Sequence, residues 1–182
     1  NGIRGGSATV HFPIWHQEIR DIIVLKNNKG TEDNRVRKLD YSIQLSALFY
    51  QRFIDNGKIT LFSPHDVAGL YDSFGTESFD ELYVKYENDD SIPKTQVDAQ
   101  ELILDLLKER AETGRIYIMN IDHCNSHSSF TDKVEMSNLC QEITLPTKPI
   151  QHIDDKTGEI ALCILSAINV GKIRDLSDLE VL

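Results

Sequence analysis

Three residues that could act together in catalysis lie within fourteen positions, in "SNLCQEITLPTKPI" (137–150). Asn138, Cys140 and Glu142 are spaced two apart, so an extended chain would place all three side chains on one face. Positions two apart in a strand lie roughly 6.6 Å from each other. A sugar-sized molecule could therefore lie across Cys140 and contact Asn138 and Glu142 through two hydroxyls, and this spacing suits a diol.

The thiol of Cys140 has three possible roles. A lone cysteine in an apolar strand is commonly a small buried hydrophobe, but Asn138 and Glu142 on the same face are costly to bury without partners. A thiolate nucleophile needs a base or cation that lowers a pKa of about 8.5, and a carboxylate at Glu142 would raise it. The combination favours a thiol that donates or accepts a hydrogen atom while the carboxylate handles a separate proton.

The composition predicts one globular segment covering residues 1–182, with 40% hydrophobic and 26% charged residues. A net charge of −10 argues against a nucleic-acid polymer as partner, although a helix start could still bind a small anion. No apolar run is long enough to span a membrane, and three widely spaced cysteines form no disulfide framework. We therefore expect a cytoplasmic protein without a membrane partner.

Periodicity and turn residues predict alternating strands and helices with short connections. The expected strands are 8–15, 59–62, 115–121 and 160–170. The expected helices are 16–28, 39–57, a short helix from 63, 78–87 and 94–113. A polar loop is expected over 122–136. This alternation is typical of α/β architecture around a parallel sheet.

Five stretches, in order along the chain, carry a resemblance to a known family. They are "NGIRGGSATV", "LKNNKGTEDNRVRKLDYSIQL", "TGRIYIMNIDHCN", "SNLCQEITLPTKP" and "GEIALCILSAINVG". Together they resemble the large (α) subunit of class I ribonucleotide reductase along essentially the whole chain. The resemblance implies part of a ten-stranded α/β barrel, built from two parallel five-stranded halves set antiparallel around a central finger loop, with flanking N- and C-terminal parts absent.

The resemblance also implies roles for the residues around Cys140. Cys140 matches the finger-loop cysteine, transiently a thiyl radical, which abstracts the ribose 3′ hydrogen. Glu142 matches the carboxylate that takes the 3′-hydroxyl proton, and Asn138 the amide that hydrogen-bonds the ribose hydroxyls. Leu139 and Gln141 complete the expected substrate-binding stretch.

Two further regions receive roles from the same resemblance. Cys163 matches one of two cysteines that reduce the substrate and become a disulfide; its partner would lie upstream of Asn1. "NGIRGGSA" resembles the loop that reports the bound allosteric nucleotide to the substrate base, with Gly2, Gly5 and Gly6 leaving the backbone free to rearrange. Arg4 would reach the substrate base or phosphate, although a solvated arginine in a turn remains open.

No metal site is predicted. His123, Cys124 and His127 in "DHCNSH" are only three possible ligands without a second pair at zinc spacing, so this loop is expected to be structural. We expect no cofactor to be bound by this segment. The resemblance implies that the full enzyme uses ATP and deoxynucleotide effectors, together with the di-metal radical cofactor of its small (β) subunit.

The implied function is reduction of ribonucleoside diphosphates to 2′-deoxyribonucleoside diphosphates, which supplies DNA precursors. It would require the remaining large-subunit segments, the small subunit, and thioredoxin or glutaredoxin. Alone, the chain is expected to be inactive and poorly stable. One alternative is a non-catalytic split-subunit piece that assembles with complementary chains; another is a cobalamin-dependent or glycyl-radical relative with the same barrel.

Overall fold

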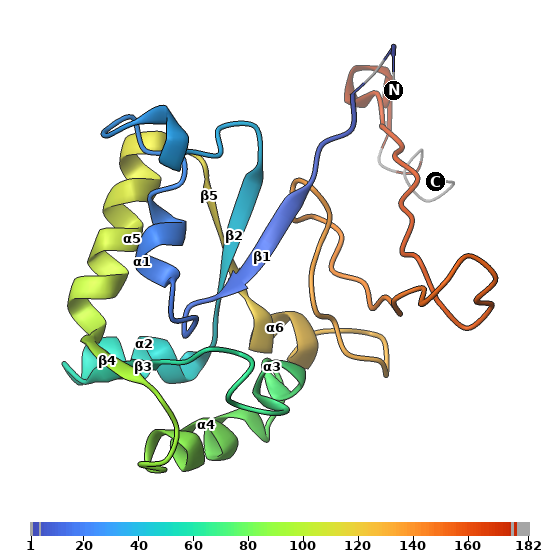
Figure 1. Ribbon diagram of the computed structural model, residues 1–182. Coiled ribbons are helices and arrows are strands. Elements are labelled where there is room, and N and C mark those ends of the chain that lie inside the picture. Colours follow the sequence, from blue (N-terminus) through green and yellow to red (C-terminus); the bar gives the residue numbers. More distant parts are fainter. Residues whose placement is uncertain (1, 4, 176, 178–182) are drawn as a thin grey trace.

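A three-stranded parallel sheet forms the centre of the protein in a computed structural model that describes residues 2–3, 5–175 and 177. The strands are β1 (Thr9–Pro13), β2 (Asp40–Leu45) and β5 (Ile116–Asn120), in the order β1-β2-β5 (Figure 1). Phe12 pairs with Ile43, and Ile43 with Ile118. The parallel α/β class is thus confirmed.

Two helices lie on one side of this sheet (Figure 1): α1 (Ile19–Ile23) and α5 (Ala99–Thr113). The carboxylate of Asp98 accepts a 3.0 Å hydrogen bond from the backbone N–H of Glu101, which fixes the start of α5. The helix ends at Gly114, whose φ of 63° is the left-handed conformation that glycine adopts without strain.

A second layer below the sheet contains a two-stranded antiparallel sheet and three helices. The strands are β3 (Lys58–Leu61) and β4 (Thr95–Asp98), and the helices are α2 (Ala47–Ile54), α3 (Leu70–Ser73) and α4 (Phe79–Glu87). Side chains from α2, α4 and the turns after β1, β3 and α3 build an aromatic core in which rings meet edge-on or tilted. Its members are Trp15, Phe49, Phe62, Phe74, Phe79 and Tyr83.

Several expected elements are corrected by the structure. The segment 39–57 is not one helix, because its first part forms β2. Tyr41 and Leu45 also fit the helical i, i+4 spacing, which masked the polar–apolar alternation of the strand. The segment 94–113 begins as β4, and the helix expected from 63 begins only at Leu70 after a turn at Gly69. The expected loop 122–136 begins as α6 (Ile121–Ser126).

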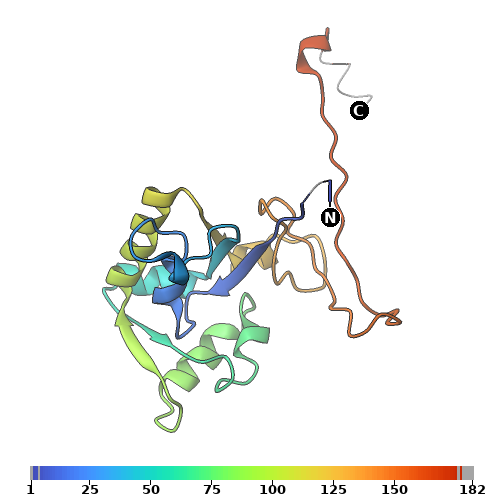
Figure 2. The same ribbon diagram turned by 45° about the horizontal axis from the view of Figure 1, so that its top comes forward.

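The strand expected at 160–170 is also wrong. This segment has no ladder partner among the described residues, and it extends away from the body of the protein (Figure 2). Its apolar side chains are solvent-exposed, with Ile164 at 96%, and a 3₁₀ turn, η2 (Val170–Lys172), begins at its last residue. A second 3₁₀ turn, η1 (Glu32–Asn34), lies between β1 and β2. An apolar sequence forms a strand only where a neighbouring strand accepts its hydrogen bonds.

The parallel sheet is open at β1 and β5, and the described part of the chain shows no closed barrel. Among these residues, no helix is both long enough and apolar enough to cross a membrane.

Candidate active site

Cys140 lies in a tight turn and not in a strand, so the predicted extended conformation of Asn138–Glu142 is wrong. The backbone N–H of Gln141 donates to the carbonyl of Asn138 at 3.2 Å, and Gln141 has a left-handed φ of 65°. The amide oxygen of Asn138 also accepts from the N–H of Ile143 at 2.9 Å. Asparagine side chains compete in this way with strand ladders, which explains why the chain reverses here.

The three predicted catalytic residues remain within this turn but do not share one strand face. The side chains of Cys140 and Glu142 are exposed, and Cys140 is a free thiol. Asn138 is half-buried; its Oδ1 is engaged with Ile143 and with the Ser137 hydroxyl, at 3.2 Å. The Nδ2 of Asn138 makes no hydrogen bond to any described residue and is available as a donor.

Strand β1 holds the turn through two side chains. The Thr9 hydroxyl donates to the carbonyl of Leu139 at 2.7 Å. Nε2 of His11 lies 3.2 Å from the carbonyl oxygen and 3.3 Å from the backbone nitrogen of Ser137. Because Leu139 directly precedes Cys140, the Thr9 contact fixes the peptide that carries the cysteine.

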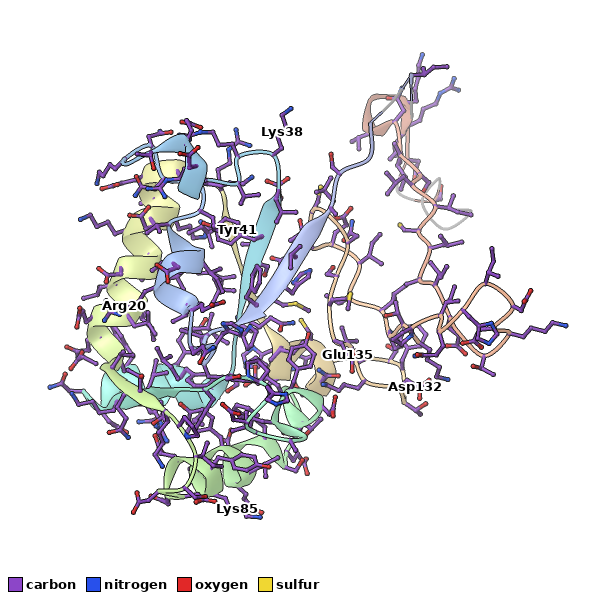
Figure 3. All side chains as sticks on the ribbon, in the orientation of Figure 1. Arg20, Lys38, Tyr41, Lys85, Asp132 and Glu135 are labelled. Atoms are coloured by element: carbon purple, nitrogen blue, oxygen red, sulfur yellow. The ribbon has the colours of Figure 1, made fainter. Side chains whose placement is uncertain are left out.

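Strand β2 holds the same segment through two more contacts. Nε2 of Gln44 donates to the carbonyl of Glu135 at 2.7 Å, and Nε2 of Gln141 donates to the hydroxyl of Ser42 at 2.6 Å. Tyr41, on the opposite face of β2, donates its hydroxyl to Ile23 in α1 at 2.9 Å. Figure 3 shows Tyr41 on the helix side of the sheet and Glu135 on the other.

Sequence reasoning missed all four strand residues, although a signal was present. His11 pairs in register with Ser42, and Thr9 and Gln44 lie two positions along their strands from this pair. Each strand therefore alternates polar and apolar residues, and its polar face meets the Cys140 turn.

Burial lowers the pKa of His11 from its usual value, while the hydrogen bond with Ser137 opposes this shift. Nδ1 of His11 is buried and has no hydrogen-bond partner among the residues that the structure describes. A proton added there would be buried and unpaired, so the neutral imidazole is the favoured form beside the turn.

A cavity of about 530 Å³ lies beside the turn, and its lining includes Ser137 and Gln141. Met119 at the end of β5 and His123 on α6 line its other side. A space of this size is in the range that holds a small molecule.

Cys163 is not brought to this site. It is exposed, within the segment that leaves the body of the protein (Figure 2). Arg4 lies outside the described residues. Gly2, Gly5 and Gly6 are exposed, and a Cβ added at any of them would meet nothing within 4 Å.

The "DHCNSH" stretch forms α6 and its C-terminal end. The rings of His123 and His127 are 5.7 Å apart between centroids. Burial and the charge of Asp122 raise the pKa of the Cys124 thiol, which keeps it protonated. In the part of the chain that the structure describes, no three His, Cys, Asp or Glu side chains are grouped so that they could hold a metal ion.

Comparison with known proteins gives a consistent result. Residues 1–181 match the ribonucleotide reductase barrel domain. The ribonucleoside-diphosphate reductase subunit alpha of Haemophilus influenzae is 59% identical over 96% of this chain, and that of bacteriophage T4 is 43% identical over 99%. The large subunit from Arabidopsis thaliana is 36% identical over 92% of this chain.

The chain spans about a quarter of the length of these relatives. It covers 24% of the Haemophilus influenzae protein, 25% of the phage protein and 20% of the Arabidopsis thaliana protein.

Proposed function

Because the chain belongs to the ribonucleotide reductase barrel-domain family, we propose that it forms a central part of a large subunit that reduces ribonucleoside diphosphates. The observation that carries this proposal is an exposed, free Cys140 on a turn held against a parallel sheet, within a family match covering residues 1–181. A thiol presented in this way is accessible to a substrate yet fixed in position.

The first chemical step is a hydrogen-atom transfer. Cys140, as a transient thiyl radical, takes the hydrogen from C3′ of the ribose, which leaves a carbon radical and a thiol. Glu142, exposed two residues away, accepts the 3′-hydroxyl proton. Nδ2 of Asn138 donates to the ribose hydroxyls. The side chain of Gln141 and the carbonyl of Leu139 already make hydrogen bonds that anchor the turn. These two residues would therefore contact the substrate through their other atoms.

The second step requires two electrons. Two thiols are oxidised to a disulfide, and the 2′ C–OH is reduced to C–H with release of water. Cys140 then returns its hydrogen to C3′ and Glu142 returns the proton to the 3′ oxygen, which regenerates the thiyl radical. We assign one thiol to Cys163 and the other to a cysteine outside these residues; thioredoxin or glutaredoxin then restores both thiols. Cys163 lies on an exposed apolar segment, so further large-subunit segments must complete the ten-stranded barrel and bring it to the Cys140 turn.

The radical source and the allosteric effectors are proposed from the family to which the chain belongs. A small subunit with a di-metal radical cofactor generates the radical, and ATP or deoxynucleotide effectors act through the loop that contains Gly2, Arg4, Gly5 and Gly6. We propose a cytoplasmic location, where these nucleotides and reductants occur.

The test uses a full-length large subunit that contains these 182 residues, with its small subunit and a reductant. We expect conversion of a ribonucleoside diphosphate to its 2′-deoxy form only when both subunits are present. Nucleotide binding and complex formation without turnover would contradict the proposal and support the alternative, a non-catalytic piece that completes an assembly. Turnover that needs cobalamin and no small subunit would indicate the other alternative.

A further inference from the structure

The polar face of β1 and β2 requires an explanation beyond packing. Ser42 and Gln44 are 0% and 1% exposed in the central strand, where apolar side chains would be the ordinary choice. Their polar groups, like those of Thr9 and His11, meet the segment 135–141. These contacts bridge 91 to 130 positions of sequence, so this face joins β1 and β2 to the segment that carries Cys140.

We propose that Thr9 and His11 are positioning residues for Cys140, which set where its sulfur stands relative to the ribose. This inference rests on the proposed function. Both residues act through the backbone: Thr9 holds the carbonyl of Leu139, and His11 holds Ser137.

The exposure of Cys140 explains why such anchors are needed. Its thiol is solvent-exposed, so packing around the sulfur does not determine its position. The backbone of the turn does this instead, and β1 holds that backbone on the N-terminal side of Cys140. On the C-terminal side, Gln141 is held by Ser42 at 2.6 Å. Because a displacement of about 1 Å can cost about 100-fold in rate, losing one anchor should affect the chemical step strongly.

A pair of substitutions at position 9 separates the hydroxyl from the shape of the side chain. Thr9→Val removes the hydrogen bond to Leu139 and keeps the branched outline, whereas Thr9→Ser keeps the hydroxyl. Thr113→Val is a matched control: its hydroxyl also donates to a backbone carbonyl, that of Glu109 at 2.6 Å, but near the C-terminal end of α5. His11→Leu and His11→Gln form a second pair, in which glutamine restores a donor.

Two readouts are measured in the full-length large subunit assembled with its small subunit. Hydrogen exchange of peptides covering 135–143 reports the turn itself, and Thr9→Val should raise their exchange rates about tenfold. Turnover of a ribonucleoside diphosphate should show a kcat about 10- to 100-fold lower with KM within about threefold. Thr9→Ser and Thr113→Val should stay near the wild-type values in both, and His11→Leu should resemble Thr9→Val, with His11→Gln closer to wild type.

The outcomes are distinct. Faster exchange in Thr9→Val and His11→Leu with an unchanged kcat would overturn the positioning role, and so would unchanged exchange with unchanged kcat. A purely structural effect, in which Thr113→Val lowers kcat as much as Thr9→Val, would overturn it as well. If the wild-type assembly itself shows no reduction, the proposed function fails and the inference fails with it. If the wild type is active and Thr9→Val has the same kcat, only the inference is contradicted.

Discussion

The turn that carries Cys140 and the segment that carries Cys163 have opposite relations to the sheet. Side chains of Thr9, His11, Gln44 and Gln141 tie the turn to β1 and β2. Within the described part of the chain, the Cys163 segment makes no such contacts with the sheet, and its apolar side chains are exposed. The difference shows that contacts within the described residues fix the backbone around Cys140, whereas none of them fixes the position of Cys163.

The largest expected effect is the loss of turnover when Cys140 is replaced. In the assembled enzyme, Cys140→Ser should abolish reduction, because an O–H bond is too strong for the radical exchange, while nucleotide binding stays nearly intact since no anchor of the turn uses the thiol. Product formation and nucleotide affinity are measured side by side. Cys124→Ser, which replaces a half-buried thiol of α6, is the control and should retain turnover. Wild-type turnover in Cys140→Ser would remove the thiyl assignment.

The next effect is at the carboxylate of the same turn. Glu142→Gln keeps the outline of the side chain but cannot accept a proton, so turnover should fall by about 10²- to 10⁴-fold, the range for a removed general base. Steady-state kinetics with a ribonucleoside diphosphate measure this loss. Glu135→Gln is a suitable control, because its contact with Gln44 uses the backbone carbonyl and its carboxylate makes a long ion pair, 3.8 Å, with Lys133. An unchanged rate in Glu142→Gln would exclude the proposed role.

The exposed segment supplies the third prediction. Expressed alone, the 182-residue chain should aggregate, because unpaired sheet edges and exposed apolar side chains favour association. The double substitution Ile164→Ser, Leu165→Ser should raise the monomeric fraction at least about threefold by size-exclusion chromatography. Ile54→Ser, an exposed apolar residue on α2, is the control and should change it little. Equal solubility in the two variants would mean that the 160–170 segment is not the source of association.

The smallest effect concerns an ion pair that joins α2 to α4. Arg52 binds Glu87 through both guanidinium nitrogens at 2.6 Å, and their side chains are 17% and 14% exposed. Glu87→Gln should lower the free energy of local opening at β3 by about 2–3 kcal/mol, measured by hydrogen exchange. The exposed pair of Lys29 and Glu112 offers the control Glu112→Gln, with a much smaller change.

The pH dependence of this contribution has a definite sign. Burial raises the pKa of Glu87, but hydrogen bonds from Arg52 and Thr60 outweigh burial and lower it below its usual 4.5. A lowered folded pKa gives stability that is fully present above 4.5 and is lost as the pH falls through the folded value. The difference between wild type and Glu87→Gln should therefore shrink on acidification, and a difference that grows would contradict this origin.

Sequence patterns predicted the parts of the fold with clear local signals. β1, β3 and β5 follow apolar β-branched runs, and Gly114 marks the end of α5, whereas its start was expected at Lys94 and lies at Ala99. β2 was missed because Tyr41 and Leu45 also fit the helical i, i+4 spacing, which masked the strand's alternation of polar and apolar residues. The strand at 160–170 was predicted from its apolar residues, but strand formation also needs a partner, which a local pattern does not contain.

The candidate site was predicted in residue type but not in shape. Asn138, Cys140 and Glu142 were identified by their chemistry, yet the expected strand is a turn because the Asn138 side chain binds the backbone of Ile143. The anchoring residues Thr9 and His11 lie about 130 positions earlier in the chain. Their role depends on a contact between distant segments, which local spacing does not reveal.

The most direct test of the central claim is a segment replacement. The part of the Haemophilus influenzae large subunit that matches this chain, at 59% identity over 96% of it, is replaced by these 182 residues, and deoxyribonucleotide formation is measured with the small subunit. The account predicts turnover within about tenfold of the parent, lost on Cys140→Ser, because the turn and its anchors are complete within the segment. A correctly assembled chimera without turnover, or with turnover that does not depend on Cys140, would contradict it.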